Sequence, residues 1–269
     1  MKLTKCKYII LLLSLFLSLN TASVSFPVSN NEKITIGIYS GQGASEACIV
    51  AAENMFEWMG YEIKRFYAKN LEAGDLNDID LFYFPGGNPF KYIDFISAKG
   101  KQRIRQRIKS GVGYIGTCAG AGFAAEQMKW RDELTSQDSL GIFPGISEAP
   151  NPRLFKFQEI GMSKVNLVKP HAITDSESAF MWILNYNSPF FTVSEGSKVD
   201  IIARYDITEQ LAMVACSYGK GRVFLIGLHP EWEEDSDRDG ISRFDNFDDQ
   251  GSDWPLMKNV VRWCLHEIN

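Results

Sequence analysis

The fold of this chain is decided by the stretch Val112-Gly113-Tyr114-Ile115-Gly116-Thr117-Cys118-Ala119-Gly120-Ala121-Gly122. An apolar run passes into the pattern Gly-x-Cys-x-Gly and then into small residues, which predicts a strand, a sharp turn and a helix. A nucleophile at such a turn needs backbone angles that side chains would obstruct, and glycines two residues before and after Cys118 remove that obstruction. We therefore predict Cys118 at the carboxyl edge of a sheet, where the positive end of a helix dipole favours the thiolate.

The alternative interpretation of Cys118 is a small buried hydrophobic residue, which is the commonest role of a free cysteine. A second apolar run, over residues 81–84, leads into Pro85-Gly86-Gly87. The bare backbone of this loop could donate the N–H of Gly87 to an oxyanion, beside the N–H of Ala119. This pairing of loops favours the nucleophile interpretation.

A third apolar run, over residues 223–228, leads into His229-Pro230-Glu231. Open α/β sheets place their sites at the carboxyl ends of strands, so all three runs would deliver their loops to one edge. We predict Cys118 as the nucleophile, His229 as the base and Glu231 as the acid that orients His229.

These motifs resemble the class I glutamine amidotransferase superfamily, whose Cys-His-Glu triad uses them in this order. A closer resemblance, over roughly residues 34–233, is to the N-terminal, amidotransferase-like domain of eukaryotic-type biotin–protein ligases. It implies a three-layer α/β sandwich with a flavodoxin-like, mostly parallel sheet, a nucleophile elbow and an added antiparallel hairpin. It is carried by Phe84-Pro85-Gly86-Gly87-Asn88-Pro89, the basic run 101–109, the Cys118 motif and Phe143-Pro144-Gly145.

The resemblance adds Gly86 and Asn88 as cleft candidates, and it has two departures. Amidotransferases that bind glutamine usually carry Gly-x-Cys-x-Gly-x-Gln, and Gly122 stands at the glutamine position. No Gly-Arg-Gly-Arg biotinyl-adenylate loop occurs, so we do not expect biotin–protein ligation.

Residues 1–25 have the three-part pattern of a secretory signal peptide. Lys2, Lys5 and Lys7 precede an apolar run over residues 8–19, and small or polar residues follow. The run is shorter than the roughly 20 residues of a spanning helix, which favours cleavage over the alternative of an uncleaved anchor. We expect one α/β domain over residues 26–269 of an exported protein, periplasmic or secreted, without a stable membrane span.

The composition of the chain indicates which classes of partner to expect. The formal net charge is −5, which argues against nucleic acid as a partner. The expected partner is a small-molecule or peptide substrate. Spacing alone does not pair the cysteines that cleavage would leave, which are Cys48, Cys118, Cys216 and Cys264.

Apolar periodicity predicts a strand over residues 33–39, a helix over 46–59 that Gly60 ends, and strands over 61–68 and 80–84. Further helices are predicted over residues 89–109, 123–130 and 254–268. The basic run of the helix over 89–109 is interpreted as a solvated face, with an anionic partner as the alternative. An irregular stretch around residues 141–152 and short β-like runs from 165 to 218 complete the pattern.

Two loops beside the expected cleft have open interpretations. Gly41-Gln42-Gly43 is either a plain strand-to-helix turn or part of a phosphate loop, and the incomplete motif favours the turn. Glu46, which follows it, either neighbours the cleft or stabilises the helix N-terminus. His171 and His266 have no motif that would bring them to Cys118.

An acidic segment supplies the one metal candidate in the sequence. Asp235, Asp237, Asp239 and Gly240 match the opening of a calcium loop, whose closing glutamate is replaced by Asn246. The alternatives are a weak calcium site and a flexible acidic loop; no other cofactor is expected.

Three functions are compatible with these residues. The first is a cysteine-dependent hydrolase or acyl-transfer enzyme using Cys118, His229 and Glu231. The second is a non-catalytic ligand-binding module that keeps the pocket. The third is a redox or stress-related protein in which Cys118 is the oxidisable thiol.

Overall fold

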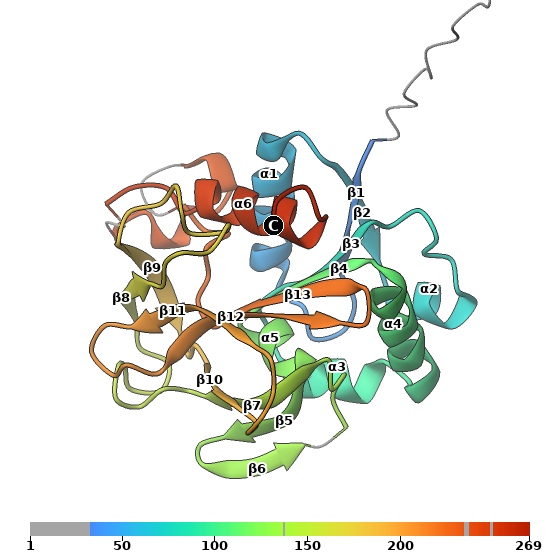
Figure 1. Ribbon diagram of the computed structural model, residues 1–269, viewed down its shortest axis with the longest axis horizontal. Helices are drawn as coiled ribbons and strands as arrows, with labels where there is room; N and C mark the ends of the chain where they lie inside the picture. Colours follow the sequence, from blue (N-terminus) through green and yellow to red (C-terminus); the bar gives the residue numbers. More distant parts are fainter. Residues whose placement is uncertain (1–32, 137, 234–236, 248–249) are drawn as a thin grey trace, which may run out of the picture. The chain divides into compact units, whose positions relative to one another are not determined.

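The computed structural model describes residues 33–136, 138–233, 237–247 and 250–269, so the predicted signal peptide lies outside the described residues. Within the unit that begins at Lys33, thirteen strands form one mixed sheet with helices on both faces (Figure 1). In the described ranges, no helix combines the length and the apolar character needed to cross a membrane.

Five parallel strands form the centre of the sheet, in the order β2-β1-β3-β4-β13. Phe84 of β3 is paired with Gly116 of β4, and Ile226 of β13 is paired with Thr117 of β4. This register brings the carboxyl ends of three strands to one edge, and it confirms the mostly parallel central sheet. The strands are β1 (Thr35–Tyr39), β2 (Glu62–Phe66), β3 (Leu81–Phe84), β4 (Gly113–Thr117) and β13 (Gly221–Ile226).

Beyond β13 the sheet continues mostly antiparallel, and this extension is larger than a single hairpin. The order is β13-β12-β10-β7-β5-β6, and β11 connects β12 to β8 and β9. Only the β5–β7 pair within the extension is parallel among the described strands. The strands are β5 (Ala125–Trp130), β6 (Glu133–Ser136), β7 (Phe143–Ala149), β8 (Ile160–Leu167), β9 (Phe180–Tyr186), β10 (Phe190–Val193), β11 (Asp200–Tyr205) and β12 (Leu211–Tyr218).

The helix predicted over residues 123–130 is wrong. Helix α5 (Ala119–Ala124) ends at Ala124, and β5 begins at the next residue. Residues of this segment pair with β6 on one side and with β7 on the other, which defines it as a strand. The irregular stretch predicted nearby contains β7, and pairing between β5 and β7 stabilises both segments as strands.

Consecutive residues of β3 point to opposite faces of the sheet and reach two different cores. Leu81 and Tyr83 pack in the core covered by α1 (Glu46–Met59) and α6 (Trp254–Cys264). Phe82 and Phe84 pack in the core on the other face, covered by α2 (Ala68–Ala73), α3 (Pro89–Phe95), α4 (Ala98–Ser110) and α5. The predicted three-layer arrangement is confirmed.

The predicted helix over residues 89–109 is two helices. The Ser97 side chain accepts a hydrogen bond from the N–H of Gly100 and caps α4 after α3 has ended. Basic side chains of α4 bind neighbouring loops rather than only water: Lys101 donates to the Asp138 carbonyl at 2.9 Å and Arg107 to the Ile79 carbonyl at 2.7 Å. Arg103 donates to the carbonyls of Leu71 and Glu72, so it binds α4 to the unpredicted helix α2.

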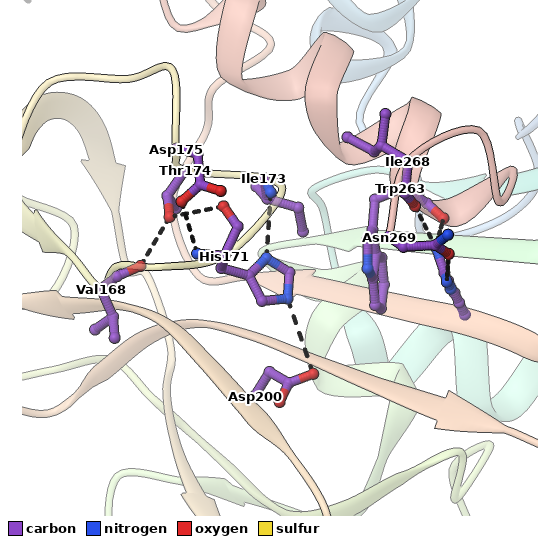
Figure 2. A network of polar contacts seen from close by, with 10 residues as sticks. Val168, His171, Ile173, Thr174, Asp175, Asp200, Trp263, Ile268 and Asn269 are labelled. Atoms are coloured by element: carbon purple, nitrogen blue, oxygen red, sulfur yellow. Dashed lines mark hydrogen bonds and ion pairs between the residues drawn. The ribbon is translucent and has the colours of Figure 1, made fainter.

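The guanidinium of Arg222, in β13, binds the C-terminal segment. Arg222 donates to the carbonyls of Trp263 and Ile268 at 2.8 and 2.7 Å, and it lies over the Trp263 ring. Trp263 also contacts His171, so the end of the chain packs against the loop after β8 (Figure 2).

The glycine spacing of the elbow can be tested by stability. A Cβ atom at Gly120 would lie 1.9 Å from the Phe84 carbonyl oxygen, whereas one at Gly122 would meet the flexible Met128 side chain at 3.3 Å. We expect Gly120→Ala to reduce the free energy of unfolding by about 3 kcal/mol, because backbone atoms must move. Gly122→Ala, on the same helix, is the matched control, with an expected change below about 1 kcal/mol. Urea unfolding measures both, and equal values for the two variants would contradict the close-approach argument.

Candidate active site

Cys118 lies in the tight turn between β4 and α5. Its backbone has φ 45° and ψ −104°, a strained conformation for a residue with a side chain. The Cys118 N–H donates to the Ile226 carbonyl at 2.9 Å, which ties the turn to β13. A Cβ atom at Gly116 would lie 2.7 Å from the Gly120 backbone, so glycines at both positions let the strand and the helix meet. The predicted strand, turn and helix are therefore present around Cys118.

His229 and Glu231 follow β13 and form a buried pair. The His229 Nδ1 and the Glu231 Oε1 atoms are 2.9 Å apart. His229 is 2% exposed and Glu231 is fully buried. The Trp254 indole N–H donates to the Glu231 carbonyl and the His229 N–H donates to the Leu184 carbonyl, so both backbones are held by neighbouring elements.

The second ring nitrogen of His229, Nε2, is available for proton transfer. His229 Nε2 is buried and has no nitrogen or oxygen partner among the described residues. Burial lowers the pKa of His229, but the charge of Glu231, the charge of Cys118 and contacts with the sulfurs of Cys118 and Cys48 raise it, and the net pKa lies well above 6.5. Cys118 thus acts on the ring electrostatically from a position in the same cavity.

Trp232 holds the imidazole from the side. Its ring stacks on His229 with centroids 4.3 Å apart and an interplanar angle of 10°, and Phe244 of the short helix η2 (Ser242–Phe244) packs against Trp232 at 4.5 Å. An aromatic face favours a neighbouring cation, so the stack stabilises a protonated ring. The Trp232 Nε1 atom is buried without a hydrogen-bond partner in the described part of the chain.

A cavity of about 160 Å³ contains Cys118 and His229 in its walls. The parallel core contributes the loops that carry these two residues, and the antiparallel extension contributes further walls from β5, β7 and the segment after β9. Most of the lining is apolar. Such a cavity, with a few polar groups converging on one side, is typical of a small-molecule site.

Cys48, in the first turn of α1, is a site residue that the sequence analysis did not predict. Its sulfur lies 3.9 Å from His229 Nδ1, and it also lines the cavity. Burial and the nearby Glu231 raise the pKa of the Cys48 thiol to about 11, so the group is a neutral thiol at neutral pH. With His229 and Glu231 it forms a group of ligand atoms within 4.8 Å of one another, which is the geometry of a possible metal site.

The loop after β3 passes beside the cavity that Cys118 lines. Gly87 and Ala119 both line the cavity beside Cys118. A Cβ atom at Gly87 would lie 2.0 Å from the Gly43 carbonyl oxygen, and one at Gly86 would lie 2.5 Å from the His229 ring. These two glycines allow the loop to approach both α1 and the imidazole.

The sequence pattern of the family described as "Biotin-protein ligase, N terminal" matches residues 34–253. The chain belongs to this family. A biotin–protein ligase of Schizosaccharomyces pombe is 24% identical over 210 residues, which cover 72% of this chain and 33% of the relative. An uncharacterized protein of Chlamydia muridarum is 26% identical over 159 residues, which cover 56% of this chain and 60% of the relative. The chain therefore spans about a third and three fifths of these two relatives.

Solved structures support the fold of this family member. A glutamine amidotransferase of known crystal structure has a TM-score of 0.60 at 18% identity, covering 86% of this chain and 98% of its own. A glutamine amidotransferase from Thermotoga maritima has a TM-score of 0.58 at 11% identity, covering 87% of this chain and 98% of its own. At these identities the likeness shows an amidotransferase-like fold and nothing further.

None of the three cleft candidates is among the described residues that line the cavity, although Gly86 adjoins the His229 ring. Asn88 caps α3, where its side chain accepts a hydrogen bond from the N–H of Phe90 at 3.0 Å. Glu46 is mostly exposed and pairs with Arg65 at 2.8 Å. Cys48, two residues further along α1, faces the site in place of Glu46 because the helix turns about 200° between the two positions.

Only some of the residues proposed as calcium ligands in the acidic segment are among the described residues. Asp235 lies outside the described residues. Asp237 begins the short helix η1 (Asp237–Asp239), and Asp239 is buried. The Asp239 carboxylate accepts hydrogen bonds from the N–H groups of Glu233 and Ile241, so its oxygens stabilise the loop backbone.

The other two histidines, His171 and His266, are not among the described residues that line the cavity. His171 Nε2 lies 3.8 Å from the Asp200 carboxylate, and its Nδ1 accepts from the N–H of Ile173 at 3.2 Å (Figure 2). Burial lowers the pKa of His171, although Asp200 and Asp175 raise it. His266 follows α6 with φ 62°, at the turn that ends the helix.

The charge state of the buried pair can be tested by titration. The imidazole of His229 should remain protonated above pH 6.5, whereas that of His171 should lose its proton below pH 6.5. Glu231→Gln should lower the pKa of His229, because it removes a carboxylate 2.9 Å from a buried cation. NMR of the imidazole nitrogens measures both rings in one sample. His171 is the internal control, and a His229 pKa that does not move in the variant would refute the electrostatic assignment.

Proposed function

We propose that this protein is a cysteine-dependent acyl-transfer enzyme or hydrolase in which Cys118, His229 and Glu231 act in series. The observation that carries the proposal is the buried His229, whose Nδ1 lies 2.9 Å from Glu231 while its Nε2 is unpaired and shares a cavity with Cys118. A nucleophile, a base and a group that orients the base are the three requirements of this chemistry.

In the acylation step the sulfur of Cys118 attacks the carbonyl carbon of an amide or similar acyl compound. The thiol proton resides on His229, and a protonated ring beside the sulfur stabilises the thiolate. A C–S bond forms and the carbonyl oxygen becomes an oxyanion, for which the N–H groups of Gly87 and Ala119 are the proposed donors. His229 then gives its proton to the leaving group as the bond between the carbonyl carbon and that group breaks.

In the second step a water molecule or another acceptor attacks the thioester. His229 takes a proton from the attacking group and keeps it as the C–S bond breaks, which restores the starting pair of protonated His229 and Cys118 thiolate. Glu231 keeps the ring in the orientation that directs Nε2 toward the sulfur, and Trp232 restricts its rotation by stacking. All atoms supplied by the protein are restored at the end of the cycle.

Reactivity at Cys118 is favoured by a contrast among the cysteines. Cys118 is partly exposed, whereas the other described cysteines are buried. Desolvation by burial is the main cause that raises the pKa of Cys216 to about 12 and that of Cys48 to about 11. These buried thiols are therefore neutral and unreactive at the pH at which Cys118 would act.

A second candidate function is a non-catalytic module that binds a small molecule. It is favoured by the mainly apolar cavity and by the unpaired Trp232 Nε1, which is a ready hydrogen-bond donor. The family description suggests a biotin-related compound as one ligand to test. Export, proposed from the pattern of residues 1–25, would place either function outside the cytoplasm.

Selective alkylation separates the two candidates. Iodoacetamide at pH 7 should modify the protein once, at Cys118, and Cys118→Ser should remove the modification. His229→Ala should slow it roughly 10-fold or more, because it removes the group that takes the proton from the Cys118 sulfur. Peptide mass spectrometry over time measures the site and the rate.

Cys48→Ser is the matched control, since it removes a sulfur from the same cavity and should leave labelling of Cys118 in place. Slow labelling of Cys118 that is insensitive to His229→Ala would contradict the enzymatic proposal and support the binding module.

A further inference from the structure

Gly122 widens the cavity beside the proposed nucleophile. It lies one turn after Cys118 on α5 and lines the same cavity. A Cβ atom at this position would meet Met128 Sδ at 3.3 Å, Ser147 Oγ at 3.7 Å and Pro89 Cβ at 3.8 Å, and all three of those residues also line the cavity. Its φ is outside the left-handed region, so the backbone does not require glycine there. The absence of a side chain at Gly122 therefore enlarges the cavity.

The walls around this space are mainly apolar. The packed rings of Trp232 and Phe244 form one side, and Trp130 and Pro189 contribute from the antiparallel extension. A cavity of about 150 Å³ holds one benzene molecule, so the 160 Å³ found here accommodates a single ring or a short branched chain.

The charged residues of the cavity lining disfavour acyl groups that carry an ammonium group. Among the described residues that line the cavity, none is an aspartate or a glutamate, and the cationic ones are Lys129, Arg243 and the protonated His229. A γ-glutamyl group carries an ammonium group that would have no carboxylate partner here. Leaving such a cation unpaired in a poorly hydrated site is unfavourable.

We infer that the acyl group accepted by Cys118 is small, apolar and uncharged, either a short branched aliphatic acyl group or a single aromatic ring. This inference rests on the proposed function, because it takes Cys118 as the group that is acylated. It assigns Gly122 the role of setting the size of the acyl pocket. The acylation is the step described above: the thioester bond forms, the bond to the leaving group breaks and His229 supplies the leaving proton.

A series of p-nitrophenyl esters tests the acyl group while the leaving group stays constant. The acetyl, isovaleryl, benzoyl, decanoyl and γ-glutamyl esters are compared by the rate of p-nitrophenolate release in the first turnover, with mass spectrometry of acylated Cys118. The isovaleryl and benzoyl esters should acylate Cys118 about 10-fold faster than the acetyl and γ-glutamyl esters, which is the discrimination that a few apolar atoms in a pocket provide. The decanoyl ester should be slow because its chain exceeds the cavity.

Two variants change the cavity in opposite directions. Gly122→Leu should reduce the ratio of isovaleryl to acetyl rates about 10-fold, with Gly122→Ala intermediate, because the side chain occupies the pocket. Phe244→Ala should shift the preferred chain toward longer acyl groups. Far-UV circular dichroism and the melting temperature show whether each variant is folded, and either variant alone can test the size dependence.

The outcomes separate the inference from the function on which it rests. If iodoacetamide fails to modify Cys118 selectively, the proposed function is wrong. If Cys118 is modified but the γ-glutamyl ester reacts as fast as the isovaleryl ester, or the rate ratio is unchanged in both variants, the assignment of the acyl pocket is wrong and the nucleophile stands.

Discussion

The structure depends on the close backbone contact at the Cys118 elbow. The φ of 45° at Cys118 is costly by about 1–3 kcal/mol, and it persists only because the surroundings hold it. Gly120 lies against the Phe84 carbonyl, and the Cys118 N–H is bound to Ile226, so β3, β4 and β13 must be in register for the turn to form. A packed parallel core thereby stores local strain at the residue that projects into the cavity.

Burial and charge oppose each other at His229, and charge prevails. Desolvation alone would leave the imidazole neutral, as at His171, where burial outweighs Asp200 and lowers the pKa. At His229 the fully buried Glu231 carboxylate is closer, at 2.9 Å, and the sulfurs of Cys118 and Cys48 also raise the pKa. The two histidines of one molecule thus titrate on opposite sides of 6.5 because of the distance and burial of their carboxylates.

The two parts of the sheet have different roles in the site. The parallel strands deliver the residues proposed for bond making, since their carboxyl ends share one edge. The antiparallel extension supplies Met128, Trp130, Ser147 and Pro189 as walls of the cavity.

The sequence by itself determined the elements whose signals are local. Glycine spacing predicted the turn at Cys118, and apolar periodicity with Gly60 predicted α1 over its observed bounds, because these signals act within a few residues. Tertiary structure decided the rest. Residues 125–130 became a strand because β7 was available for pairing, and Cys48 entered the site because α1 packs with that face toward His229. Both depend on partners far away in the chain, and no local pattern records which partner will be close enough to contact.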